Sequence, residues 1–173
     1  EPDAQMLGNF ATGFMHTTEL ALSVRSLEGQ NGPSHPTVEA VAQSLLSPPV
    51  AAVDPQWVAQ TDVFGAMAPL RDASEPLERG YFERLDWWLF NQAWEPWYGK
   101  FEYGDGKTYF FGDDWYMWSN NEPAQDYMFW LAFLRSGNPT YFHAAKAASR
   151  HTMDVDNIHW PKARPYVGDT NPS

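Results

Sequence analysis

The stretch from Trp115 to Trp160 reads WYMWSNNEPAQDYMFWLAFLRSGNPTYFHAAKAASRHTMDVDNIHW, and it predicts two helices joined by a short turn. Asn121 is placed to cap the first helix, with Glu122 and Pro123 in its first turn. Apolar residues follow at helical spacing and cover several faces: Tyr127, Phe129, Trp130, Leu131, Phe133 and Leu134. A helix with this pattern is expected to be buried on nearly all sides.

The second helix of this stretch is predicted from about Thr140 to Asp154. Ser136-Gly137 breaks the first helix, Asn138 can cap the next one, and Pro139 suits its first position. Alanines dominate its first half, which allows a neighbouring helix to approach closely. Residues 121 to 154 therefore predict an antiparallel helical hairpin with its turn at 136–138.

A short turn places the start of the first helix and the end of the second at the same end of the hairpin. Polar groups are expected to meet there: Asn120, Asn121, Glu122, Arg150, His151, Asp154, Asp156 and His159. Three tryptophans lie nearby in the sequence: Trp115, Trp118 and Trp160. Aromatic rings can cover the apolar face of a sugar while polar groups hold its hydroxyls and carboxylate, so this end is predicted to bind carbohydrate.

The charge balance excludes some partners. The 173 residues contain 11 Lys and Arg against 22 Asp and Glu, a formal net charge of −11. A nucleic-acid partner would require a basic face, so none is expected. An anionic ligand would have to be held by local Arg, His and amide groups, because the overall field repels it.

Cysteine is absent, which excludes a disulfide framework and a cysteine-based zinc site or nucleophile. No run of residues has the length and apolar character of a membrane span, and no signal peptide is visible. The chain opens without Met, so we expect a processed or truncated piece.

Other segments predict the organisation around the hairpin. Alternation from Phe14 to Val24 predicts a strand with one covered side. A short helix is expected from Thr37 to the Pro48-Pro49 stop, followed by a connector over residues 50–73 anchored by Trp57, Val63 and Phe64. Ser74 is expected to start a further helix with a core stripe of Leu77, Tyr81, Leu85 and Trp88. The glycine- and aromatic-rich segment 98–114 is predicted to be a functional loop.

Six motifs, taken in order, resemble the six-hairpin (α/α) toroid polysaccharide lyases of the exo-rhamnogalacturonan lyase and ulvan lyase type. They read DPQWVAQTDVFG, RLDWWLFNQ, WYGKFEYGDG, NNE, FLRSGNPTYFHAA and RHTMDVDNIHW and cover roughly residues 54 to 160. The segment GFMHTTELALSV is similar to the end of the β-domain that precedes the toroid in such proteins.

This resemblance implies a mainly α fold, namely a partial (α/α) toroid of two to three helical hairpins with a β-strand segment at the N-terminus. Residues 1–36 would be the end of the β-domain and a linker, and residues 37–173 the partial toroid. Six hairpins need about 250 residues or more, so the chain is expected to be a fragment, or to join further copies or the missing part of its protein. Apolar surface that a complete toroid covers would then be exposed. The resemblance also implies a secreted or periplasmic protein.

The implied activity is cleavage of an acidic, uronate-containing polysaccharide or oligosaccharide by β-elimination. This reaction needs a group that neutralises the uronate carboxylate, a base for the C5 proton and an acid for the leaving oxygen. Asn120, Asn121 and Arg150 are candidates for the first role. His151 or His159 is the candidate base, and Tyr103 or Tyr127 the candidate acid.

Alternatives remain open at this stage. Asp154, Asp156 and His159 have a spacing that could hold a divalent cation such as calcium, although turn carboxylates more often accept backbone donors. Asp105, Asp113 and Asp114 are a second, weaker candidate cation site. A glycoside hydrolase on an α/α scaffold would use Glu122 with Asp105 or Asp114. A non-catalytic carbohydrate-binding fragment would need only the tryptophan surface.

Overall fold

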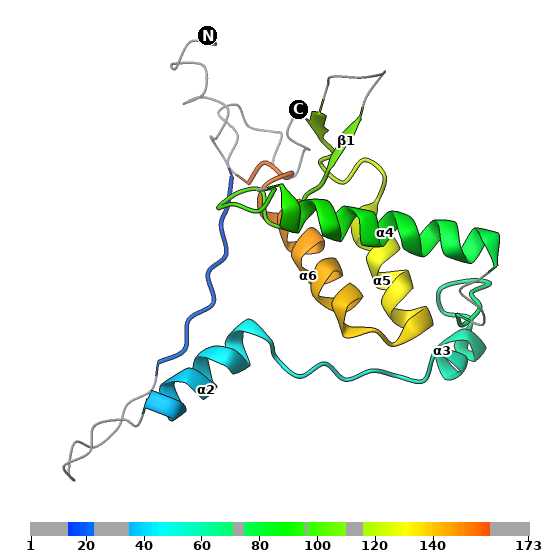
Figure 1. Ribbon diagram of the computed structural model, residues 1–173, viewed down its shortest axis with the longest axis horizontal. Helices are drawn as coiled ribbons and strands as arrows, with labels where there is room; N and C mark the ends of the chain where they lie inside the picture. The colour runs from blue at the N-terminus through cyan, green and yellow to red at the C-terminus, as the bar shows by residue number, and fades with distance from the viewer. Residues whose placement is uncertain (1–13, 23–34, 71–74, 96, 110–115, 160–173) are drawn as a thin grey trace. The chain divides into compact units, whose positions relative to one another are not determined.

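The computed structural model describes residues 14–22, 35–70, 75–95, 97–109 and 116–159. The chain divides into two compact units, one formed by residues 18–51 and the other by the remainder. The smaller unit contains helix α2, His35–Leu46. All other helices and strands belong to the larger unit, which carries the site discussed below (Figure 1).

The hairpin predicted from the sequence is confirmed. Helix α5 spans Gln125–Ser136 and helix α6 spans Pro139–Asp154, and the two lie side by side (Figure 1). Gly137 ends α5 in the left-handed conformation, at φ 71°, where a residue without Cβ is least strained. The Asn138 side chain caps α6 by accepting a hydrogen bond from the Thr140 N–H at 3.0 Å.

Paired side chains show that α5 and α6 are antiparallel. The Trp130 indole donates to the Ser149 hydroxyl at 2.9 Å near one end, and the Phe133 and Phe142 rings lie 5.2 Å apart near the turn. Ala145 and Ala148 on α6 are buried, and small residues of this kind permit close approach of neighbouring backbone.

The first helix of the hairpin starts later than the sequence predicts. Residues 120–123 form turns, with Asn120, Asn121 and Ala124 all in the left-handed region. The Asn121 side chain still accepts a hydrogen bond from the first turn of α5, at the Asp126 N–H, 3.3 Å away. The predicted burial on nearly all sides is confirmed apart from Tyr127, which is 51% exposed, because α5 packs on α6, α3 and α4.

Helix α4, Pro76–Trp94, packs on the hairpin as expected. The Tyr81 hydroxyl donates to the Met128 carbonyl oxygen at 2.5 Å, and the Tyr141 hydroxyl donates to Asp86 at 2.8 Å. Leu85 and Trp88 belong to the core, but Leu77 is 90% exposed, so its assignment to the core stripe is wrong. Leu77 lies in the first turn of α4, beyond the last residues that contact the hairpin. The predicted start at Ser74 lies outside the described residues.

The connector predicted over residues 50–73 contains a helix, α3, Pro55–Thr61. The Asp54 side chain caps it by accepting from the Gln56 N–H at 2.8 Å, and Pro55 occupies the first turn. Val58 is its buried residue, whereas the predicted anchors are exposed: Trp57, Val63 and Phe64. The Asp-Pro pair was the sequence signal for this helix.

Two further predictions of secondary structure are wrong. The Gly-rich segment 98–114 is not loop throughout, because Lys107–Tyr109 within it form strand β1, which pairs antiparallel with β2, Tyr116–Trp118, just after the segment. Residues 14–22 form no strand, since the described part of the chain offers them no strand partner. Met15 instead donates its backbone N–H to the Asp154 carbonyl oxygen at 2.7 Å. Val24, the predicted end of this strand, lies outside the described residues.

Exposed apolar side chains are present, as expected from the sequence. On the outer side of α4 the Phe90 and Trp94 rings are both exposed and stack on each other with centroids 6.0 Å apart. None of the helices in the described segments is long and apolar enough to cross a membrane.

Candidate functional site

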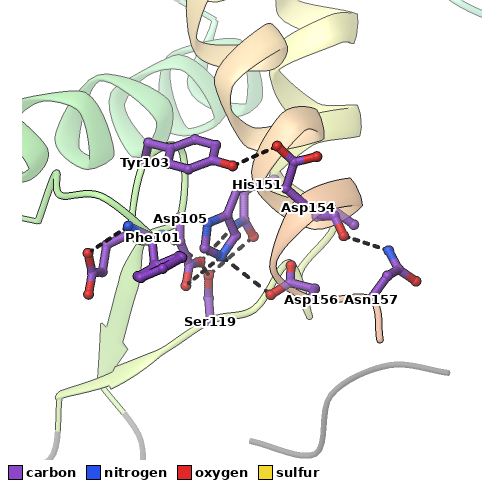
Figure 2. Close-up of polar contacts among 12 residues, drawn as sticks. Phe101, Tyr103, Asp105, Ser119, His151, Asp154, Asp156 and Asn157 are labelled. Carbon is purple, nitrogen blue, oxygen red and sulfur yellow. Dashed lines mark hydrogen bonds and ion pairs between the residues drawn. The ribbon is translucent and has the colours of Figure 1, made fainter. Parts of the chain in front are cut away.

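The site lies at the open end of the hairpin, where the loop 97–106 crosses the last turns of α6 (Figure 2). Gly104 holds this loop against α6: it has a positive φ of 79°, and a Cβ there would lie 2.2 Å from the backbone carbon of Ala147. At Gly106 a Cβ would lie 1.7 Å from the indole nitrogen of Trp88. Only residues without a side chain permit these two contacts, which fix Asp105 between them and Tyr103 next to Gly104.

His151 lies at the centre of the site and is 3% exposed. Its Nε2 atom is 3.3 Å from Asp156 Oδ1 and 3.6 Å from Asp105 Oδ2. The Tyr103 ring covers the imidazole edge-on with centroids 5.8 Å apart. Figure 2 shows the imidazole, which comes from α6, between these groups from the loop before β1 and the turn after α6.

Asp105 connects this cluster to the start of α5. Its Oδ1 atom accepts three hydrogen bonds, from the Gly106 N–H at 2.7 Å, the Ser119 hydroxyl at 2.8 Å and the Gln125 amide at 3.1 Å. All four residues are buried. The two open ends of the hairpin are therefore joined through one carboxylate, whose other oxygen faces His151.

The two carboxylates beside His151 outweigh the effect of burial on its pKa. Burial favours the neutral imidazole and lowers its pKa, but the adjacent Asp156 and Asp105 outweigh burial, so the pKa of His151 is raised. Burial also raises the pKa of Asp105, partly offset by its hydrogen-bond donors and by His151. His151 is thus favoured as a cation held between two carboxylates.

Asp154 has different partners from Asp156. The Tyr103 hydroxyl and the Thr17 N–H both donate to Asp154 Oδ2, at 2.8 Å and 3.0 Å. Burial tends to raise the pKa of Asp154, but these donors prevail and lower it, so the group is ionised at neutral pH. Burial and the hydrogen bond to Asp154 raise the pKa of Tyr103, which keeps its phenol neutral.

A groove of about 480 Å³ opens beside Asp154. Its lining residues come from the N-terminal segment, α6 and the turn that follows: Met15, Thr17, Arg150, Met153, Asp154, Asn157 and His159. The volume lies within the range of small-ligand sites. The groove combines one guanidinium, one imidazole, one amide and two thioethers, a mixture of charged, polar and apolar groups.

His159 is the imidazole that lines this groove. Its Nε2 atom lies 2.6 Å from the Met153 carbonyl oxygen. Because a carbonyl can only accept, this contact requires the proton on Nε2, and the neutral ring then has its lone pair on Nδ1. Such a nitrogen can take up a proton.

The structure gathers only part of the predicted site. Arg150, Asp154 and His159 share the groove, and Tyr103 and His151 lie directly behind it. Within the described segments the polar turn does not line the groove: Asn120, Asn121 and Glu122. That turn reaches the cluster through its neighbour Ser119 and through Gln125.

The remaining predicted residues are dispersed. Tyr127 lies exposed on α5, and its proposed role as an acid stays a prediction. Trp118 ends β2, where the Lys107 ammonium lies 4.7 Å from its ring centroid. The other aromatic and acidic candidates lie outside the described residues: Trp115, Trp160, Asp113 and Asp114.

The candidate cation ligands were also located. In the described segments no group of three or more His, Asp or Glu side chains has an arrangement that could hold a metal ion. Asp154 accepts from Tyr103 and Thr17, and Asp156 faces His151. Calcium binding by Asp154 and Asp156 stays a sequence-based prediction.

Sequence reasoning missed several residues of the site. Ser119 and Gln125 carried no signal, because a buried hydrogen bond from a turn to a distant loop is not periodic. Met15 and Thr17 were assigned to a strand and not to the groove. Asp105 was considered as a cation ligand or hydrolase carboxylate, whereas the structure places it beside His151.

Residues 48–165 match the protein family described as the PcRGLX-like protein C-terminal alpha/alpha toroid domain. This match covers more than half of the chain, and the chain belongs to this rhamnogalacturonan-lyase-like toroid family. The chain is also similar to YetA of Bacillus subtilis (strain 168), which is described as an uncharacterized protein. The two are 30% identical over 162 residues, 86% of this chain and 18% of YetA. The chain thus spans less than a fifth of the length of this relative.

Proposed function

We propose that the groove binds a uronate-containing polysaccharide, and that the protein to which this toroid domain belongs cleaves it by β-elimination, in the manner of exo-rhamnogalacturonan or ulvan lyases. The observation that carries this proposal is the groove itself, which brings Arg150 and His159 together beside the ionised Asp154. Family membership supports a carbohydrate-related role.

Each step of an elimination has a candidate group here. Arg150 would neutralise the uronate carboxylate, which acidifies the C5 proton. His159, with Nδ1 unprotonated, would take up that proton. The neutral phenol of Tyr103 has a proton to give to the leaving oxygen, once its bond to Asp154 is exchanged for one to the substrate.

In this proposal His151 supports the site and does not touch the substrate. With 3% of its surface exposed and two carboxylates beside Nε2, it lacks access to a ligand in the groove. It holds Asp105 and Asp156 in place under the groove. A protein of this kind acts on extracellular material, so we also propose that it is secreted or periplasmic.

Arg150→Ala is expected to weaken binding of a rhamnogalacturonan tetrasaccharide by about tenfold to a hundredfold, because hydrogen bonds to charged groups contribute about 1.5–3 kcal/mol. Isothermal titration calorimetry measures the change. Lys146→Ala is the matched control: it removes the same charge one turn earlier on α6, at a residue that does not line the groove. Equal weakening by both variants would contradict a specific contact to Arg150.

A further inference from the structure

Residues 14–17, here called the N-terminal strap, cross the end of α6 with alternating side chains. Phe14 and His16 face the loop 97–106: the Phe14 ring lies 6.3 Å from that of Phe101, and His16 lies edge-on to Tyr103 at 5.7 Å. Met15 and Thr17 both line the groove. Side chains of an extended chain alternate between two sides with a period of two residues. On one side the strap contacts the aromatic rings of the loop 97–106, and on the other it forms a wall of the groove.

Asp154 holds the strap through both of its acceptor groups. Its carbonyl oxygen accepts from the Met15 N–H at 2.7 Å, and its Oδ2 atom accepts from the Thr17 N–H at 3.0 Å. The carboxylate is 2% exposed and also accepts from the Tyr103 hydroxyl. A buried carboxylate that receives donors from Thr17, 137 residues away in the chain, and from Tyr103, 51 residues away, fixes both segments relative to the helix.

We infer that Asp154 is a positioning residue that makes the strap one wall of the ligand groove, so that docking of the strap and binding of the sugar stabilise each other. The inference rests on the proposed function, because it concerns the same groove. Asp154 acts on the ligand through the strap and needs no contact with the reacting atoms.

The coupling follows from the shape of the groove. Among the described residues that line it, Met15 and Thr17 belong to the strap, so a ligand in contact with them binds the docked strap more tightly than the released one. By reciprocity, a change that releases the strap weakens binding of the ligand by the factor by which the ligand prefers the docked strap. The apparent dissociation constant of the ligand is inversely proportional to the fraction of molecules in which the strap is docked.

Thr17→Pro tests the inference, because proline removes the N–H that Asp154 accepts. Thr17→Ala is the matched control, since it removes the side chain but keeps the donor. Because the Thr17 side chain itself lines the groove, the loss due to the N–H is read from the comparison of the two variants: we expect the dissociation constant of Thr17→Pro for the rhamnogalacturonan tetrasaccharide to be at least tenfold higher than that of Thr17→Ala. Both variants should keep the thermal unfolding midpoint of the wild-type chain within a few degrees.

Hydrogen exchange gives a second measurement on the same proteins. In the wild-type chain the Met15 and Thr17 amides should exchange slowly, and the tetrasaccharide should slow them further. In Thr17→Pro the Met15 amide should exchange faster than in Thr17→Ala.

Three results would overturn the coupling. If Thr17→Pro binds the sugar with the same dissociation constant as the wild type, the strap is not a wall of the site. A sugar that binds but leaves the exchange of both amides unchanged shows that it does not contact the docked strap. If the wild-type chain binds no tetrasaccharide while the two amides remain protected, the proposed function fails and the coupling with it, although the strap contact stands.

Discussion

His151→Ala is expected to lower the free energy of unfolding by about 3–5 kcal/mol, the range found when one partner of a buried ion pair is removed. The imidazole lies between Asp105 and Asp156, all three residues are buried, and each carboxylate has an oxygen within 3.6 Å of Nε2. Without the imidazole the two carboxylates face each other across a cavity. Urea unfolding followed by circular dichroism measures this loss.

His143→Ala is the matched control for His151→Ala. Both residues lie on α6, so the two changes alter helix propensity equally, but His143 is not buried and faces the Phe142 ring. We expect it to cost less than about 1 kcal/mol. If His151→Ala were as stable as His143→Ala, the proposed ion pairing of His151 with Asp105 and Asp156 would be contradicted.

The effect of His151→Ala should also depend on pH. The pKa of His151 is raised in the folded protein, so its contribution is fully present below the unfolded-state pKa of about 6.5. It is lost as the pH rises through the higher folded-state pKa. The stability difference between wild type and variant is therefore expected to be largest in mildly acidic solution and to shrink toward alkaline pH. A difference that grows with pH would contradict the assignment of a cationic imidazole.

Gly104→Ala is expected to destabilise the domain by about 2–5 kcal/mol. Two costs add: about 1–2 kcal/mol for placing a Cβ at positive φ and about 1–3 kcal/mol for overpacking against α6. A Cβ at Gly104 would lie 2.2 Å, 2.3 Å and 2.5 Å from backbone atoms of Ala147 and Ala148, so the loop or the helix would have to move to remove the clash. Thermal unfolding monitored by circular dichroism measures this loss as a lower unfolding midpoint.

Gly65→Ala separates the two costs of Gly104→Ala. Gly65 has a similar φ of 75°, but a Cβ there would have no atom within 4 Å, so only the conformational cost applies. We expect Gly65→Ala to cost about 1–2 kcal/mol. Equal losses for both variants would mean that the loop does not lie against α6, and the positions of Tyr103 and Asp105 would have to be revised.

The hairpin could be predicted from the sequence because its signals are local. Gly137, Asn138 and Pro139 specify the turn within three residues, and the alanines of α6 specify close packing. The helix α3 was missed because it is only seven residues long and its cap, Asp54, lies within a segment rich in Pro and Gly. The strand at residues 14–24 was wrong because alternation reports an extended chain with two different sides but does not identify its partner.

The site could be predicted only where it follows from the hairpin. Arg150, Asp154 and His159 lie on α6 and the turn after it, so helical spacing brought them together correctly. The roles of Asp105 and Thr17 depend on hydrogen bonds to α6 or α5 across many intervening residues, which no local pattern encodes. The burial of His151 depends on the loop 97–106. This burial distinguishes His151, which supports the site, from His159, which lines the groove.

Elimination at this groove is tested by the ultraviolet absorbance of the products that the complete protein forms on rhamnogalacturonan. Elimination leaves a conjugated double bond at the new sugar end, whereas hydrolysis leaves none. We expect absorbance to rise with time, and His159→Ala to lower the rate by about a hundredfold or more while His143→Ala does not. New reducing ends without absorbance, or binding without any product, would contradict it.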